Sequence, residues 1–191
     1  MLLVINCGNP YDVGEVGKLL NFEKIGIHNF SKAPEPCRFC LYWQTKGELQ
    51  NAASKRDVEK EKLKWLNIVE KTFGNCIEIV SLNGTTIGFM QYALAKYFPR
   101  VEDYFSGPPS EDAAFIACLY IVDKDQRRRG YGTVMLEKLL KELSGRGFKA
   151  VETFARMSSE NNPSGPLTFY LKHGFEIVRQ IDDFPLVRIK L

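Results

Sequence analysis

The amino-acid sequence predicts a single α+β domain, in which helices cover the faces of a mixed sheet in three layers. The order of periodic segments along the chain reads β-α-α-β-β-β-α-β-α-β-β. Asn83-Gly84 separates two strand-like segments and is a strong hairpin signal. The apolar run Ala113–Val122 precedes an amphipathic helix, as expected for a strand buried on both faces. We therefore expect residues 1–191 to form one domain.

The first third of the chain is the least regular. Leu2–Asn6 predicts a strand, and a helix is expected from about Pro10 to Phe22. Residues 26–56 have no clean period and contain two prolines, so we interpret them as an irregular insertion that could shape a pocket. A charged amphipathic helix is expected over Lys55–Phe73, with Gly74-Asn75 ending it.

The hairpin strands are expected at Cys76–Leu82 and Thr85–Tyr97, followed by a loop that leads to the buried strand. In the helix after that strand, apolar residues repeat at i, i+3, i+4 and i+7 from Leu136 to Leu143. Gly145 is expected to take the left-handed cap position at its end.

The last quarter of the chain alternates strands with one short helix. Ala150–Arg156 predicts a strand, and Ser158–Gly165 a polar loop. Pro166 fits the first position of a helix that ends at Gly174. Phe175–Ile181 and Leu186–Leu191 predict a final pair of strands.

Composition restricts the class of protein. The chain has 45% hydrophobic and 26% charged residues, as globular domains do, and its formal net charge of +3 is too small to indicate nucleic acid or a membrane surface as partner. The apolar opening Met1-Leu-Leu-Val-Ile5 has no basic leader and is too short for a signal peptide, so we expect a cytoplasmic protein. Five cysteines, an odd number, argue against a disulfide framework.

The stretch Arg127-Arg-Arg-Gly130-Tyr-Gly132 lies at the start of the central helix. Helix starts have backbone N–H groups without intrahelical partners, and glycines there allow a ligand to approach them closely. The helix dipole and the arginines favour an anion, so we expect a pyrophosphate site. No lysine follows these glycines as a P-loop requires, and Met135 stands where a dinucleotide-binding motif has its third glycine.

The stretch resembles the [Q/R]-x-x-G-x-[G/A] signature of GNAT-superfamily N-acetyltransferases. Leu119-Tyr-Ile-Val-Asp123 resembles the strand before that signature, and Phe169-Tyr170-Leu-Lys-His-Gly174-Phe175 resembles the F-Y-x-x-x-G-F segment of the family. The resemblance covers about Thr85 to Leu191. It implies a sheet that splays between its fourth and fifth strands, with acetyl-coenzyme A as cosubstrate and its pantetheine arm in the gap. The residues expected to contact this cofactor are Tyr120, Ile121, Val122, Arg127, Arg128, Arg129, Gly130, Tyr131, Gly132, Thr133, Asn162 and Phe169.

Acetyl transfer to an amine requires a base, an oxyanion donor and a proton for the leaving thiolate. A lysine-like amine has a pKa near 10.4 and arrives protonated at neutral pH. An unpaired backbone N–H around Tyr120 to Val122 would stabilise the oxyanion. The resemblance places the general acid at Tyr170, four residues before Gly174; the alternative is a core tyrosine with a hydrogen-bonded hydroxyl.

The base is left open. Candidates are a chain of waters and the carboxylates Glu152, Glu78, Glu111 and Asp112, each of which could equally be a surface charge. Asn161 and Asn162 are both available for the asparagine that the family often uses to hold pantetheine. His173 is expected to cap a helix C-terminus.

Cys37 and Cys40 form a C-x-x-C pair. Zinc would need two further ligands, and only Cys7 and His28 are near in sequence, so we expect no metal; a redox dithiol and a buried loop are the alternatives. Arg38, Tyr42 and Trp43 could line an acceptor pocket.

Three functions are compatible with the sequence. The first is transfer of an acetyl group to a primary amine of a small molecule or peptide. The second is an inactive acyl-coenzyme A sensor or regulatory module. The third is nucleic-acid binding through Arg127–Arg129, which the modest net charge disfavours. The acceptor, and whether the chain is a monomer or a homodimer, stay open.

Overall fold

The computed structural model describes residues 20–46, 54–159 and 162–191. The strands are β1 (Leu20–Lys24), β2 (Ile77–Leu82), β3 (Thr85–Leu94), β4 (Ala113–Ile121), β5 (Ala150–Phe154), β6 (Glu176–Arg179) and β7 (Leu186–Lys190). The α-helices are α2 (Glu35–Arg38), α4 (Lys55–Thr72), α5 (Tyr131–Gly145) and α6 (Leu167–Lys172). Short 3-10 helices are η1 (Ile27–Lys32), η2 (Ala95–Tyr97), η3 (Pro99–Asp103) and η4 (Lys124–Gln126). No described helix is both long and apolar enough to cross a membrane.

The strands form one seven-stranded sheet in the order β1-β2-β3-β4-β5-β7-β6. Neighbouring strands are antiparallel except β4 and β5, which are parallel and joined by the crossover helix α5. This confirms the predicted α+β class and the mixed, mostly antiparallel sheet.

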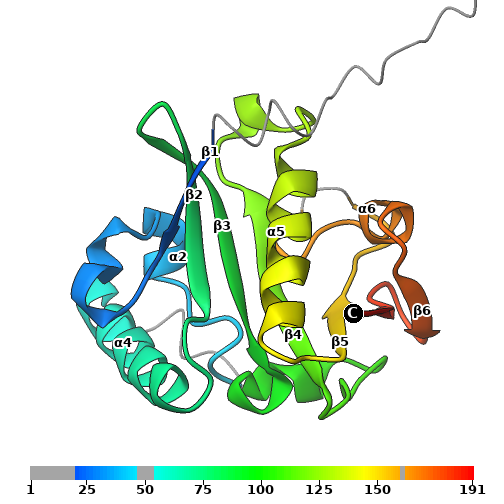
Figure 1. The fold of residues 1–191 in the computed structure, drawn as a ribbon. Coiled ribbons are helices and arrows are strands. Elements are labelled where there is room, and N and C mark those ends of the chain that lie inside the picture. The colour runs from blue at the N-terminus through cyan, green and yellow to red at the C-terminus, as the bar shows by residue number, and fades with distance from the viewer. Residues whose placement is uncertain (1–19, 47–53, 160–161) are drawn as a thin grey trace, which may run out of the picture.

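Helices cover the two faces of the sheet (Figure 1). On one face, Leu66 and Val69 of α4 pack with the aromatic residues Phe98 and Phe115. On the other face, the leucines that repeat along α5 pack against β3 and β4, as their spacing predicted. These two clusters are the hydrophobic core.

The predicted helix from Pro10 to Phe22 is wrong at its C-terminal end. Residues 20–24 form β1, which pairs with β2 from Leu20↔Leu82 to Lys24↔Glu78. Leu20 and Phe22 alternate with polar residues and pack toward the α5 face, which is the period of a strand. The remainder of that prediction, and the strand predicted at Leu2–Asn6, lie outside the described residues.

The boundaries of the other elements follow local chemistry. Ser54 caps α4 by accepting from the Asp57 N–H at 3.3 Å. Asn83 and Gly84 have positive φ values of 51° and 81°, as a two-residue hairpin turn of type I′ requires. The hairpin and the long helix are therefore confirmed.

Two caps differ from the predictions by one or two residues. The left-handed residue after α5 is Gly147, with φ 88°, because Gly145 is still helical. The N–H groups of Gly147 and Phe148 donate to Ser144 and Leu143, which closes a Schellman motif. Pro166 precedes α6 as its N-cap, with extended φ and ψ, and is not its first helical residue.

Candidate active site

The turn into α5 contains two residues in the left-handed conformation. Gly130, the N-cap, has φ 82° and ψ −9°, and Arg128 has φ 60°. Gly130 accepts from the N–H groups of Thr133 and Val134 at 3.0 and 3.2 Å. The N–H groups of the first helical residues, Tyr131 and Gly132, have no carbonyl one turn earlier to bind. The predicted anion site therefore has the required backbone shape, and a side chain at Gly130 would strain it.

The three arginines differ in their surroundings. Arg127 is half-buried, and its Nε donates to the carbonyl of Ile121 at 3.2 Å, so it ties the turn to the end of β4. Arg128 and Arg129 are exposed beside the helix start. Arg127 thus has a structural contact with β4, and Arg128 and Arg129 are exposed at the surface.

β4 and β5 pair over only three positions, from Ala113↔Ala150 to Phe115↔Glu152. Beyond Phe115 the strands separate, as the resemblance implied. The Thr153 hydroxyl crosses the start of this gap and donates to the Ile116 carbonyl at 2.8 Å.

A β-bulge in β4 lies at the same level. Gln91 of β3 pairs with Cys118 and Tyr92 pairs with Ile116, so Ala117 is the extra residue. As a result, Ala117 and Cys118 both face the α4 side of the sheet, although they are adjacent. Tyr120 then follows Cys118 on that side.

Near the end of β4, backbone N–H groups point alternately toward β3 and toward the gap. The Val122 N–H donates to Ile87 of β3 at 2.8 Å, so it is not the unpaired donor that the sequence suggested. The N–H of Leu119 points into the gap instead and donates to the Pro163 carbonyl at 2.9 Å. Sequence reasoning missed Leu119, because the bulge that sets this alternation leaves no local signal. Ile121, two residues further, is turned to the same side.

Tyr170 lies on α6 and is fully buried at this gap. Its hydroxyl donates to the Ser164 carbonyl at 2.6 Å, and its ring makes edge contacts with Phe169 and Phe175. Burial raises the pKa of the phenol above its usual value, and a hydrogen bond with Thr153 partly offsets that rise. The phenol is therefore protonated at neutral pH and lies beside the strand opening; its part in catalysis stays a prediction.

The helix α6 is attached to the first turn of α5. His173 Nε2 lies 3.0 Å from Thr133 Oγ1, and its Nδ1 lies 2.7 Å from the Phe169 carbonyl, which confirms its expected place near a helix C-terminus. A Cβ on Gly132 would lie 3.6 Å from the Phe169 ring, an ordinary contact. Asn162 bonds the Ser164 hydroxyl at 2.8 Å and so holds the intervening loop, whereas Asn161 lies outside the described residues.

The candidate bases Glu152 and Asp112 have structural partners. Glu152 is fully buried and accepts from the Ser110 N–H, the Ser110 hydroxyl and Arg188 at 2.6–2.8 Å. Asp112 forms a two-point ion pair with Arg188, which lowers the pKa of its carboxyl. Both carboxylates are thus paired with Arg188, which holds them in the charged form and makes them weak bases for the acceptor.

The other two candidates lie elsewhere. Glu78 is buried against Lys138 of α5, with its carboxylate 2.5 Å from the ammonium, and burial raises the pKa of Glu78. Glu111 is exposed in the loop before β4. The structure leaves the base unassigned among the four carboxylates.

A small cavity of about 50 Å³ lies on the α4 side of the sheet. It is lined by Pro36, Cys37, Cys40, Trp43, Gln44, Lys62, Phe89, Gln91, Cys118, Tyr120 and Pro163. Of the three residues expected to shape a pocket, Trp43 lines it. Tyr42 is exposed and its hydroxyl bonds that of Tyr104 at 2.9 Å, and Arg38 pairs with Glu59 at 3.3 Å.

Cys37 and Cys40 are free thiols in this cavity wall. Cys37 Sγ lies 2.7 Å from the Tyr120 hydroxyl, and burial raises the pKa of the thiol to about 11. Within residues 20–46, 54–159 and 162–191, no group of three metal-ligating side chains is arranged to hold a metal ion; Cys7 lies outside these ranges. Cys37 is buried in α2, and Cys40 follows this helix at intermediate exposure.

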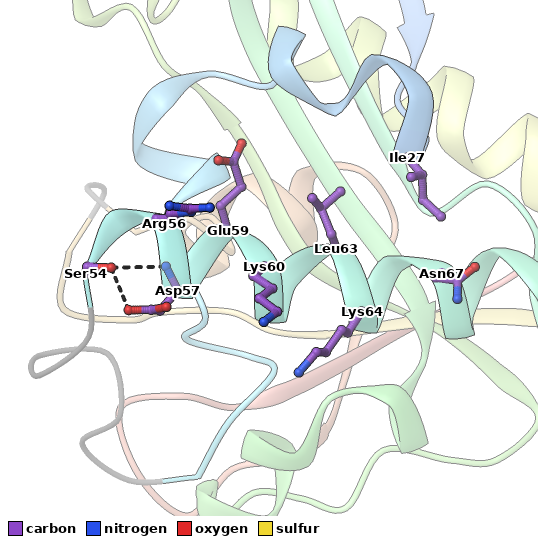
Figure 2. A pocket seen from close by; sticks show the side chains of 9 residues that line it. All are labelled: Ile27, Ser54, Arg56, Asp57, Glu59, Lys60, Leu63, Lys64 and Asn67. Carbon is purple, nitrogen blue, oxygen red and sulfur yellow. Dashed lines mark hydrogen bonds between the residues drawn. The ribbon is translucent and has the colours of Figure 1, made fainter.

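A larger hollow of about 910 Å³ runs along the outer side of α4 (Figure 2). Its lining comes from Ile27, from Ser54 and from α4 residues such as Lys60 and Lys64, most of them charged and solvent-facing. It shares no lining residue with the gap or with the small cavity, so it is separate from the candidate active site.

Comparisons with known proteins agree with this geometry. A family model described as the acetyltransferase (GNAT) family matches residues 35–175. A PaiA N-acetyltransferase from Thermoplasma acidophilum, in complex with coenzyme A, has 14% identity and a TM-score of 0.57, over 90% of this chain and 99% of that one. An acetyltransferase from Thermus thermophilus has 17% identity and a TM-score of 0.56, over 90% and 97%. The aminoglycoside acetyltransferase AAC(6')-Ib, also with coenzyme A, has 18% identity and a TM-score of 0.56, over 90% and 94%. No curated protein sequence matches this chain significantly.

Proposed function

The chain belongs to the GNAT family of acetyltransferases, and from this premise we propose that it moves an acetyl group from acetyl-coenzyme A to a primary amine by direct attack. The observation that carries the proposal is the meeting of two features at the end of β4. One is the opened β4–β5 pairing, and the other is the left-handed Gly130 at the start of α5. Two of the similar structures are complexes with coenzyme A, which supports the same ligand here.

The residues fit this cofactor. The amides from Arg128 to Thr133 surround the helix start, where they and the exposed arginines would bind the pyrophosphate. The β4 stretch from Tyr120 to Val122 borders the gap, and its Ile121 N–H is turned toward it. Phe169 and Asn162 lie at the other wall, beside the helix start and in the loop. When bound, acetyl-coenzyme A supplies a thioester whose carbonyl the amine attacks.

The chain's own groups then have defined tasks. A backbone N–H of β4 facing the gap donates to the developing oxyanion. Tyr170 holds a proton for the departing sulfur, because burial keeps the pKa of its phenol raised. Its hydroxyl turns from the Ser164 carbonyl toward the gap in order to act. This protonated group at the gap favours an enzyme over an inactive sensor.

The cofactor site is tested by a matched pair of substitutions. Gly130 and Gly147 stand at opposite ends of α5, with φ values of 82° and 88°. Alanine at either position costs about 1–2 kcal/mol of strain. Calorimetry with coenzyme A is expected to show at least a tenfold weaker affinity for Gly130→Ala and an unchanged one for Gly147→Ala. Equal affinities in two folded variants would remove the cofactor from this helix start.

The transferase reaction is tested separately. Wild-type protein is incubated with acetyl-coenzyme A and a library of primary amines, and acetylated products are identified by mass spectrometry. An enzyme gives at least one product, with stoichiometric release of free coenzyme A. A protein that binds coenzyme A but acetylates no amine would be the sensor instead.

A further inference from the structure

Lys62 of α4 is a buried cation in the wall of the small cavity. Only 2% of its surface is exposed. Its ammonium donates to the Cys40 carbonyl at 3.0 Å, to Gln44 Oε1 at 2.9 Å and to Gln91 Oε1 at 2.6 Å. These three oxygens are neutral, so they satisfy its protons but leave its charge uncompensated.

The buried thiols Cys37 and Cys76 near Lys62 do not supply the missing negative charge. Burial lowers the pKa of the Lys62 ammonium, and the thiols of Cys40, Cys118, Cys37 and Cys76 shift that pKa in the opposite direction. The three hydrogen bonds of Lys62 to oxygens use all three N–H donors of the charged form. Burial raises the pKa of Cys37 to about 11 and that of Cys76 to about 12, so both are neutral at pH 7. In the part of the chain that the structure describes, no ion pair joins Lys62 to a carboxylate. A buried ammonium without a counter-charge is costly unless a ligand brings one.

A second donor in the same wall also lacks a partner. Gln44 Nε2 is buried and has no hydrogen-bond partner among the described residues. The orientation of this amide is fixed, because an ammonium cannot accept a hydrogen bond and Oε1 must face Lys62. The cavity therefore combines a buried positive charge with an unsatisfied N–H donor, and both are suited to an anionic oxygen acceptor.

The cavity adjoins the proposed reaction site. Cys118 and Tyr120, which the β4 bulge turns to the α4 side, line it, and so does Pro163, whose carbonyl binds the Leu119 N–H in the gap. A molecule anchored beside Lys62 would thus have its other end at the opening between β4 and β5.

We infer that this cavity binds the carboxylate of a small amino-acid-like acceptor, with Lys62 and Gln44 as the specificity-determining residues. The inference rests on the proposed acetyltransferase function and adds the substrate class. The carboxylate supplies the counter-charge for Lys62 and accepts from Gln44 Nε2, while the amine of the same molecule lies toward the gap.

Size and charge set the limits of the acceptor. A water needs about 10–15 Å³ of such space, so about 50 Å³ holds a few atoms the size of a carboxylate group and no large ring system. A polycationic acceptor would place like charge against Lys62 and is disfavoured.

Binding is measured on the full chain with paired probes that lack a reactive amine. N-acetylglycine, N-acetyl-β-alanine and N-acetylalanine are each compared with the corresponding amide. Trp43 in the cavity wall is one of only two tryptophans in the sequence, so intrinsic fluorescence reports occupancy. Wild type is expected to bind at least one acid ten times more tightly than its amide. Equal affinity for acid and amide in every pair would overturn the inference.

Three variants test which residues cause the preference for the acid over the amide. Lys62→Met keeps the length of the side chain without its charge, and is expected to bring the acid-to-amide affinity ratio close to one. Gln44→Leu removes the unpaired Nε2 donor together with the Oε1 that accepts from Lys62, but keeps the lysine itself. It is expected to reduce the ratio about threefold or more, which keeps the test decisive if Lys62→Met does not fold. Lys60→Met, on the solvent side of the same helix, is expected to keep the wild-type ratio. A folded Lys62→Met protein with the wild-type ratio would refute the assignment.

Turnover separates this inference from the proposed function. For glycine and glycinamide, kcat/KM is measured in wild type and in Lys62→Met, and each protein gives one glycine-to-glycinamide ratio. Dividing the Lys62→Met ratio by the wild-type ratio cancels the different basicities of the two amines. We expect the glycine-to-glycinamide ratio to be at least tenfold lower in Lys62→Met than in wild type, mainly because KM for glycine rises. Efficient acetylation of polyamines with no preference for carboxylates would overturn the inference and leave the transferase function intact. Failure to bind coenzyme A would overturn the transferase function, while the acid-to-amide ratio still decides this site.

Discussion

Replacing Tyr170 by phenylalanine removes one hydroxyl at the gap and separates two roles of that group. In the structure the hydroxyl donates to the Ser164 carbonyl at 2.6 Å, and both groups belong to a buried region. Loss of that donor leaves the carbonyl unsatisfied, which costs about 1–3 kcal/mol of folding free energy. For a domain of this size, each kcal/mol lowers Tm by roughly 2–4 °C.

The catalytic effect is expected to be much larger than the effect on stability. General acid catalysis contributes about 10²–10⁴-fold, so Tyr170→Phe is expected to lower kcat and kcat/KM by that factor while coenzyme A affinity changes little. Because burial raises the pKa of the phenol, it stays protonated while a lysine-like amine titrates near 10.4. The alkaline side of the wild-type pH–rate profile should therefore show no loss from Tyr170.

Tyr92 provides the matched control. It is equally buried, and its hydroxyl donates to Asn75 and Glu142 at 3.1 and 3.3 Å, at the end of α5 opposite to Gly130. Tyr92→Phe should cost similar stability and leave kcat unchanged. Steady-state rates of both variants, measured on an acceptor found in the amine library, decide the matter. A Tyr170→Phe enzyme with full kcat would show that the thiolate leaves without this proton.

Three further predictions concern charge and titration. At least one of Arg127→Ala, Arg128→Ala and Arg129→Ala should weaken coenzyme A binding about tenfold at low salt and less at high salt, by calorimetry; three neutral substitutions would reduce the run to a solvated surface. Glu152→Gln should lose about 1.5–3 kcal/mol of unfolding free energy in urea, because a buried carboxylate with three hydrogen bonds becomes an amide; an unchanged midpoint and slope would contradict this role. Burial raises the pKa of Cys37 to about 11, whereas an unfolded thiol ionises near pH 8.5, so the unfolded state loses its proton first. Stability should then fall by about 1.4 kcal/mol per pH unit between these values, and Cys37→Ala should lessen that slope; an identical slope in both proteins would disprove the linkage.

Local chemistry explains which elements the sequence predicts well. The Asn83-Gly84 turn, the Ser54 cap and the leucine stripe of α5 each depend on residues within one or two turns of each other. Such features are readable without tertiary contacts. The strand β1 was misread because its alternation of Leu20 and Phe22 with polar residues is short and follows a helix-like stretch.

The acceptor side depends on contacts that are distant in sequence. The bulge at Ala117 and Cys118 reverses which residues of β4 face α4, and no turn residue marks it. Lys62 did leave a signal: it lies four residues after Val58 and four before Leu66, in the buried stripe of α4. A lysine at an apolar-face position predicts burial of a charge, but only the structure shows that Gln44 and Gln91 meet it there.

The loop before α6 gives the gap between β4 and β5 an occupant of its own. Pro163 accepts from Leu119, and Ser164 accepts from Tyr170, so two of the polar groups of the gap are satisfied by this loop. A pantetheine arm in the proposed position would compete with this loop for the same polar groups, and the loop is tethered beside them. The measured affinity for coenzyme A is then the intrinsic affinity of the opened form reduced by the fraction of molecules that are open. Substitutions that loosen this loop but keep Asn162 should therefore tighten cofactor binding without adding a single contact to the ligand.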